Sequence, residues 1–191
     1  MNKYTLANKL HYIFSILMLF AIVLILSGAF YFQFIQHELP CPLCLLQRVA
    51  YLGICFGIIL NLRIGFSMRH EALSMLMIIL LMIVSARQTL LDIYPRPGHE
   101  YIGSSVFGLH MPVWSIVFAV IFLLMYVLRF LILGYDLQKA QISHFPIIKN
   151  LSRFAMLIIL LICGLNLISV FLQCGFSECH TDAYQLLTGS I

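Results

Sequence analysis

Cys41 and Cys44, separated by two residues, have a spacing typical of thiol–disulfide chemistry. The thiolate form of cysteine carries out disulfide exchange, and a helix N-terminus favours it through free N–H groups and the helix dipole. Pro40 and Pro42 hold the approach extended, and an apolar run begins at Cys44. We therefore predict a redox dithiol at the mouth of a membrane helix, reachable from water and next to lipid.

Arg48 follows Cys44 by four residues, so both side chains should lie along one helical face. A guanidinium one turn inside hydrocarbon is a functional-site hypothesis, and the alternative is an arginine that only snorkels to the interface. Beside a dithiol, Arg48 is expected to favour the Cys44 thiolate. It should also hydrogen-bond a quinone carbonyl, where a fixed cation stabilises the negative charge that reduction builds.

A second pair, Cys174 and Cys179, follows the last apolar segment. One interpretation is a relay, in which a partner's dithiol reduces this pair and the pair then reduces Cys41–Cys44. The other is a structural disulfide that pins a short tail. Cys55 and Cys163 fall near the middle of apolar segments, and we interpret both as packing residues.

The composition points to a membrane protein, because 62% of the 191 residues are hydrophobic and only 9% are charged. Soluble domains carry about 25% charged residues. A membrane span needs about 20 apolar residues. By this criterion the chain is one integral membrane domain, residues 1–191, with spans at roughly 12–34, 44–62, 72–91, 112–133 and 154–173. The basic residues are spread among loops, which argues against a nucleic-acid partner.

The distribution of Lys and Arg predicts the orientation, since cytoplasmic loops carry the excess of these residues. With Arg48 counted within a span, only Arg87 and Arg96 lie on the even-numbered side. The odd-numbered side, which includes the N-terminus, holds eight basic residues: Lys3, Lys9, Arg63, Arg69, Arg129, Lys139, Lys149 and Arg153. A cytoplasmic N-terminus and five crossings would put both cysteine pairs and the loop from Tyr94 to Met111 on the outer face.

Three segments resemble the bacterial disulfide-bond formation protein B family, DsbB, over roughly residues 10 to 130. The most specific is Leu39-Pro40-Cys41-Pro42-Leu43-Cys44-Leu45-Leu46-Gln47-Arg48, which is similar to the family's active-site segment. The others are Gly108-Leu109-His110-Met111-Pro112-Val113-Trp114 and Tyr94-Pro95-Arg96-Pro97.

The resemblance implies an all-α, polytopic membrane helix bundle, with a four-helix core to which this chain adds a fifth C-terminal transmembrane helix. It implies that Cys41 and Cys44 are the quinone-facing redox pair and that Arg48 and Gln88 bind the quinone, ubiquinone or menaquinone. The implied partner is a periplasmic, DsbA-like thioredoxin-fold thiol oxidase, and the implied location is the bacterial inner membrane. No metal site is predicted.

The chain departs from this family in its second cysteine pair. Relatives carry that pair between spans three and four, whereas here no cysteine occurs between Cys55 and Cys163. We infer that Cys174 and Cys179 replace it, delivered to the outer face by the fifth span. The alternative function is a non-redox assembly or structural subunit, with outer loops stapled by disulfides or by zinc. The aromatic segment between Tyr101 and Leu109 is expected to lie in the membrane interface, as a roof over the quinone site, a docking groove or an ordinary loop.

Overall fold

The computed structural model describes residues 3–38, 40–94, 105–133 and 146–175. Within these ranges the chain forms five long helices and one short hairpin, in the order α1 (Lys3–Ile35), α2 (Pro42–Ile64), α3 (Met68–Ile93), β1 (Ser105–Val106), β2 (Leu109–His110), α4 (Met111–Leu133) and α5 (Pro146–Cys174). All five helices are long and apolar enough to cross a membrane. The prediction of an all-helical, multi-pass membrane bundle is confirmed.

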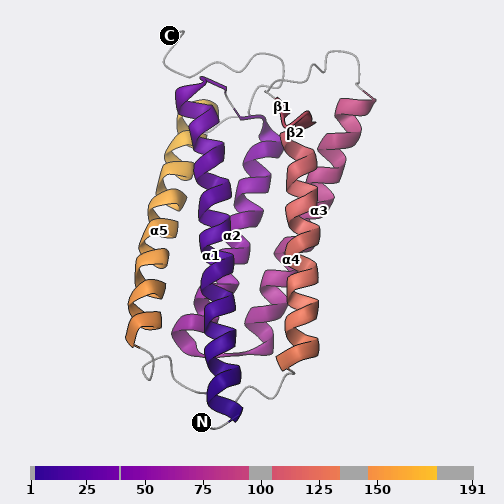
Figure 1. The fold of residues 1–191 in the computed structure, drawn as a ribbon. Helices are drawn as coiled ribbons and strands as arrows, with labels where there is room; N and C mark the ends of the chain where they lie inside the picture. Colours follow the sequence, from indigo (N-terminus) through magenta and orange to yellow (C-terminus); the bar gives the residue numbers. More distant parts are fainter. Residues whose placement is uncertain (1–2, 39, 95–104, 134–145, 176–191) are drawn as a thin grey trace.

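The first four helices form a bundle, and α5 lies outside it (Figure 1). Contacts join α1 to α2, α2 to α3, α3 to α4 and α4 back to α1, which closes the four-helix core. The fifth helix packs on α1 and α2. With five helices, α1 begins at one end of the bundle and α5 finishes at the other.

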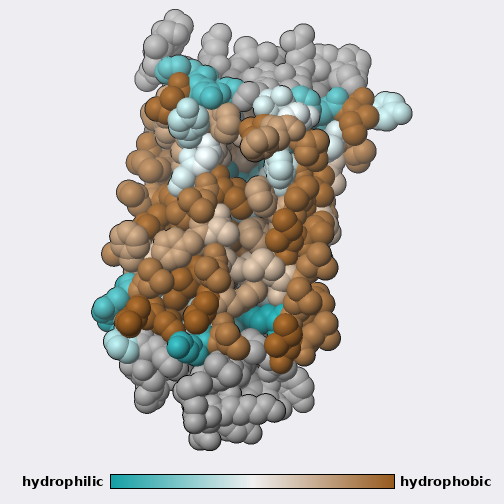
Figure 2. Space-filling view, viewed as in Figure 1, coloured by the Kyte–Doolittle hydropathy of each residue, from teal (hydrophilic) through white to brown (hydrophobic). Residues whose placement is uncertain are grey.

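Each helix buries one apolar stripe and turns the rest of its apolar surface outward. In α1 the buried residues Leu19, Ile22 and Leu26 recur at helical spacing, while the nearby Leu17 and Leu24 are 60% and 72% exposed. Figure 2 shows the outcome as a hydrophobic surface over most of the height of the visible face, with hydrophilic residues near both ends. This distribution suits lipid as the surrounding solvent.

All five helices extend beyond the predicted spans, and α1 and α5 do so by the most residues. The first begins at Lys3, nine residues before the predicted 12, and α5 begins at Pro146, eight residues before the predicted 154. A span prediction counts only apolar residues, whereas a helix continues through polar flanks for as long as its backbone hydrogen bonds are made. Proline suits the first helical position of α5, because its missing N–H would have no partner there.

A close approach joins α2 to α3. A Cβ added at Gly57 would lie 2.2 Å from Ser74 Oγ and 2.7 Å from the backbone oxygen of His70, so only glycine fits. Ser74 in turn donates a hydrogen bond to the Ile54 carbonyl at 3.1 Å. Small residues let membrane helices approach closely, which holds α3 in place against α2.

A β-hairpin precedes α4, at the end of the bundle where α2 begins (Figure 1). Its strands are antiparallel, with Val106 paired to Leu109, and its turn residues Phe107 and Gly108 both have positive φ, 52° and 76°. This pattern is typical of a two-residue hairpin turn. Trp114 of α4 donates its indole N–H to the Val106 carbonyl at 2.9 Å and so ties the hairpin to the bundle.

A buried ion pair joins α3 to α4 at the end of the bundle opposite the hairpin. Glu71 is 1% exposed and Arg129 is 5% exposed, and Arg129 Nη2 lies 2.7 Å from Glu71 Oε2. Asn61 of α2 donates to Glu71, and Arg129 Nη1 lies 3.2 Å from His11 Nδ1 of α1. Because a guanidinium has only donors, that His11 nitrogen accepts. Four helices thus meet at one polar cluster.

This cluster contains Arg129, which was counted among the basic residues of the odd-numbered side. It lies within α4 and is buried, so it is not part of the loop charge. Without it the odd-numbered side keeps seven basic residues against two. The predicted orientation therefore keeps its basis.

Candidate active site

The predicted redox pair lies at the start of α2. Cys41 is the N-cap residue, with extended backbone (φ −68°, ψ 160°), and Pro42 occupies the first helical turn. The Cys41 sulfur accepts a hydrogen bond from the Cys44 backbone N–H at 3.1 Å, and the two cysteines form a disulfide. Both are partly exposed. The local sequence therefore places a disulfide at a helix N-terminus, where backbone N–H groups stabilise a negative sulfur.

Gln88 of α3 provides the polar side chain closest to the two sulfurs among the described hydrogen bonds. Its Nε2 donates to Cys41 Sγ at 3.1 Å and to Cys44 Sγ at 3.3 Å. Its Oε1 lies 3.8 Å from Cys44 Sγ, a contact that a protonated thiol could turn into an S–H donation. Gln88 thus combines one donor and one acceptor for the two states of the sulfur.

Two further side chains hold Gln88 in this orientation. Gln47 of α2 donates from Nε2 to Gln88 Oε1 at 2.7 Å, and Ser115 of α4 donates to Gln47 Oε1 at 2.9 Å. All three are buried, with exposed fractions of 9% or less. Because each amide oxygen accepts here, each amide nitrogen is free to donate onward, and the series ends with an N–H on the sulfurs.

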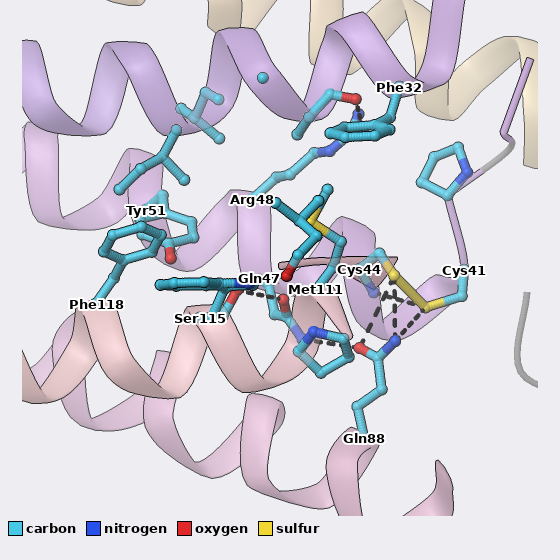
Figure 3. Close-up of a pocket in the computed structure, with 18 of the residues that line it drawn as sticks. Phe32, Cys41, Cys44, Gln47, Arg48, Tyr51, Gln88, Met111, Ser115 and Phe118 are labelled. Atoms are coloured by element: carbon cyan, nitrogen blue, oxygen red, sulfur yellow. Dashed lines mark hydrogen bonds between the residues drawn. A yellow bond between two sulfur atoms is a disulfide. The ribbon is translucent and has the colours of Figure 1, made fainter. Parts of the chain in front are cut away.

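Arg48 is 6% exposed and reaches away from the disulfide toward α1 (Figure 3). Its Nη1 donates to Gln33 Oε1 at 2.6 Å, its Nη2 donates to the Ala29 carbonyl at 3.3 Å, and its guanidinium lies 4.9 Å from the centre of the Phe30 ring. A guanidinium that is buried and makes two hydrogen bonds inside the bundle does not snorkel to the membrane interface. The direct action on Cys44 that the shared helical face predicted stays a prediction, since the described hydrogen bonds of Arg48 go to α1.

The disulfide, Arg48 and Gln88 line one cavity of about 460 Å³. Its wall comes from α1, α2, α3, α4 and the hairpin, and Figure 3 shows Tyr51, Ser115 and Phe118 at its other end. Apolar and aromatic residues make up most of this wall, among them Leu24, Ile25, Phe32, Val106, Phe107, Trp114 and Phe118. A mostly apolar cavity of this size with a few convergent polar groups is typical of a small-molecule site.

Two features of the cavity wall suit a ligand: space beside Gly28 and the hydroxyl group of Tyr51. Gly28 of α1 lines the cavity, and a Cβ built there meets nothing within 4 Å. The Tyr51 hydroxyl is buried and has no hydrogen-bond partner among the described residues, while the Ser115 hydroxyl in the same wall donates to Gln47 instead. A buried hydroxyl without a partner is unfavourable unless a ligand or water satisfies it.

The end of α5 lies beside the Cys41–Cys44 segment. Gln173 Nε2 donates to the Pro40 carbonyl at 2.7 Å, across 133 residues of sequence. Cys174 is the next residue and the last of α5, so its backbone lies at the same end of the bundle as the disulfide. Cys179 lies outside the described residues, so the structure does not describe the second half of the predicted pair.

The two remaining cysteines differ from each other. Cys55 is fully buried in the core, in agreement with its interpretation as a packing residue. Cys163 is exposed on the outer surface of α5, so that interpretation is wrong for it. A position near the middle of a span does not reveal whether a side chain lies on the buried face or the lipid-facing face of the helix.

Sequence reasoning placed Cys41, Cys44, Arg48 and Gln88 in the site, and the structure brings all four to one cavity. It missed Gln33, Gln47, Ser115 and Tyr51. A signal for three of them was available, because glutamines and serines are few within apolar spans and polar residues there face the bundle interior. No pattern of residues indicated that Gln47, adjacent to Arg48, would turn toward α3.

Comparison with known proteins supports a relationship over the first three helices. The family model for disulfide bond formation protein DsbB matches residues 11–100. Disulfide bond formation protein B 1 of Burkholderia lata is 39% identical over 54 residues, which is 28% of this chain and 32% of the relative. Disulfide bond formation protein B of Burkholderia ambifaria is 37% identical over the same shares. These matches span about a third of each relative's length, and no solved structure matches.

Proposed function

We propose that this chain, which belongs to the DsbB family of disulfide bond formation proteins, generates disulfides by passing electrons from a thioredoxin-fold protein to a membrane quinone. One observation carries the proposal. A disulfide at a helix N-terminus and a buried guanidinium line the same apolar cavity, inside a five-helix membrane bundle. The names of the relatives refer to disulfide bond formation, and a disulfide is one of the two products of the proposed reaction.

The cavity fits a quinone headgroup, a flat ring with two carbonyl acceptors. Apolar walls suit the ring and its substituents, and the Arg48 guanidinium and the Tyr51 hydroxyl are donors for carbonyl oxygens. Two described hydrogen bonds occupy only two of the five guanidinium donors, so Arg48 has donors left for a ligand. When bound, ubiquinone or menaquinone supplies the acceptor for two electrons and two protons.

The residues around the sulfurs would stabilise the charge that exchange creates. An incoming thiolate breaks the Cys41–Cys44 bond, forms a mixed disulfide with one sulfur and leaves the other as a thiolate. The Gln88 N–H groups already point at both sulfurs, so the neutral N–H···S contacts become charge-assisted at that moment. The donor's second thiolate then breaks the mixed disulfide, so the donor leaves with its own disulfide and both Cys41 and Cys44 are reduced. Re-formation of the Cys41–Cys44 disulfide from two thiols releases two electrons and two protons, which a quinone in the cavity would take.

The donor side of the reaction is proposed to run through the tail. A partner's dithiol would reduce a Cys174–Cys179 disulfide, and the resulting dithiol would reduce Cys41–Cys44, with two electrons moved at each exchange. The hydrogen bond from Gln173 to Pro40 supports this route, because it holds the helix that carries Cys174 beside the residue that precedes Cys41. Four sulfurs on one side of the membrane are the requirement that a relay imposes.

The orientation is also a proposal. A cytoplasmic N-terminus, which the basic residues favour, puts the disulfide, the hairpin and the end of α5 on the periplasmic face of a bacterial inner membrane. An oxidising compartment there would supply a thioredoxin-fold thiol oxidase as the partner. Phe107, 93% exposed at the hairpin turn, would then lie in the outer membrane interface, and Val106 and Phe107 would cover the cavity.

The function is tested by a coupled assay with purified protein in detergent. Reduced thioredoxin-fold oxidase and a short-chain ubiquinone or menaquinone analogue are mixed, and loss of quinone absorbance is followed together with loss of partner thiols. We expect one quinone reduced for each disulfide formed, because both processes move two electrons. Partner oxidation without quinone reduction, or no turnover with either quinone, would contradict the proposal.

Replacement of the tail cysteines separates the relay from a structural disulfide. We expect Cys174→Ser or Cys179→Ser to lower partner oxidation to background, since the partner's electrons lose their entry point. Quinone reduction driven by dithiothreitol should stay within twofold of wild type, because a small dithiol reaches the partly exposed Cys41–Cys44 pair directly. Cys163→Ser, which removes an exposed cysteine from α5, is the matched control. Unimpaired partner oxidation by both tail variants would return the tail pair to a structural role.

A further inference from the structure

Three buried polar side chains connect the cavity to the fifth helix. Arg48 of α2 donates to Gln33 Oε1 of α1 at 2.6 Å, and Gln33 Nε2 donates to Ser169 Oγ of α5. Their exposed fractions are 6%, 8% and 5%. Arg48 lines the cavity, whereas Ser169 does not, so the hydrogen bonds connect the Ser169 hydroxyl to the site through Gln33 and then Arg48.

The chemistry of the three groups fixes the direction of both hydrogen bonds. A guanidinium has only donors, so Gln33 must present its carbonyl oxygen to Arg48. The amide nitrogen of Gln33 then points the other way and needs an acceptor, which is the Ser169 oxygen. Without that acceptor the buried amide N–H would be left unsatisfied, and rotation of the Gln33 amide would become a competing arrangement.

The residues around Ser169 indicate that its contact with Gln33 belongs to a buried polar face of α5. Asn166, Ser169 and Gln173 lie on one face of the helix at spacings of three and four, and all three are buried. Leu167 and Ile168, the two residues that precede Ser169, are 70% and 58% exposed. Polar residues in membrane helices face the bundle interior and pair there, so the polar face of α5 is directed at α1 and α2.

We propose that Ser169 and Gln33 are positioning residues for Arg48, so that α5 is a component of the quinone-binding centre. The inference rests on the proposed function. The match to the DsbB family covers residues 11–100, which include Gln33 and Arg48 but not Ser169. The fifth helix therefore adds a support to the site from outside the part of the chain that matches the family.

Trp114 gives a readout of binding that does not depend on turnover. It is the only tryptophan of the chain, and it lines the cavity. A quinone bound there should quench its fluorescence, so titration of a short-chain ubiquinone analogue into purified, oxidised protein gives a dissociation constant. We expect Ser169→Ala to weaken binding about threefold to tenfold, the effect of one ordinary hydrogen bond lost from the network.

The matched control is Ser152→Ala. Ser152 is also a buried serine of α5, but its hydroxyl donates to the Lys149 carbonyl of its own helix, and we expect quinone binding within about 1.5-fold of wild type. Arg48→Ala should weaken binding by roughly tenfold to a hundredfold, because it removes a charged donor. Adding Ser169→Ala to Arg48→Ala should change nothing further, since the two residues act as one unit.

The outcomes distinguish the inference from the function on which it rests. Wild-type protein whose Trp114 fluorescence does not respond to quinone would overturn the proposed function and this inference with it. A wild-type response with unchanged affinity in Ser169→Ala would overturn the inference alone. So would an equal loss of affinity from Ser169→Ala in the wild-type and Arg48→Ala backgrounds, because Ser169 would then act by a route other than Arg48.

Discussion

Cys41→Ser and Cys44→Ser are each expected to lower quinone reduction to the uncatalysed rate, with either a protein partner or dithiothreitol as the donor. The two sulfurs form the disulfide that faces the cavity, and Gln88 directs its N–H groups at both of them. A serine hydroxyl cannot form a disulfide or take part in thiol–disulfide exchange. We therefore expect each replacement to abolish the catalysed rate and not only to lower it in part. The measurement is the rate of quinone absorbance loss at saturating donor.

The matched control for these two variants is Cys55→Ser. Cys55 is fully buried in the same helix, and it lies away from the cavity wall. Its replacement should keep more than half of the wild-type rate. Trp114 quenching should show that the Cys41 and Cys44 variants still bind quinone, because Arg48 and the apolar wall remain. Quinone reduction that survives both single replacements would show that the assigned redox centre is wrong.

The fold was predictable because the membrane imposes one strong requirement. Backbone polar groups in lipid must be satisfied within the segment, so a long uncharged stretch is a helix with few alternatives. The helix ends were less predictable, as Lys3 and Pro146 show, because polar flanks continue a helix without adding to its hydropathy. The hairpin before α4 was not predicted, since its pairing depends on two residues with positive φ, one of which is Phe107.

The site residues that lie close together in the sequence could be predicted. Cys41, Cys44 and Arg48 fall within eight residues, and helical spacing alone relates them. The contacts from Gln33 to Arg48 and from Gln88 to the sulfurs join different helices, 15 and more than 40 residues apart. Such contacts depend on how helices rotate about their axes, which a single sequence with continuous apolar spans leaves open.

The same reasoning explains why the buried pair at the opposite end was missed. Glu71 and Arg129 each lie near a helix end, where a charge is ordinarily solvated, and 58 residues separate them. By hydropathy alone, Glu71 and Arg129 cannot be distinguished from charged residues in a solvated loop. Only the packing of α3 against α4 brings them together and buries both.

Glu71→Ala is expected to destabilise the folded bundle by about 3–5 kcal/mol, because it leaves a buried charge without its counter-ion. Arg129 would keep its contact to His11, and four aromatic rings would still surround it, those of Phe14, Phe66, Tyr126 and Phe130. Rings and a neutral imidazole do not replace a carboxylate bonded through both oxygens. The free energy of unfolding in a titration with sodium dodecyl sulfate, followed by Trp114 fluorescence, measures the loss.

Removal of both charges tests whether the loss comes from the unpaired arginine. The double variant Glu71→Leu with Arg129→Met should regain most of the stability, since an apolar pair of similar volume avoids the desolvation of two ions. Arg63→Ala removes an exposed charge from the last turn of α2 and should change the free energy by less than about 0.5 kcal/mol. If the double variant were as unstable as Glu71→Ala, the carboxylate would matter through Asn61 and the α2–α3 junction instead of through Arg129. The cluster lies at the far end of the bundle from the cavity, so molecules of Glu71→Ala that remain folded should bind quinone with wild-type affinity.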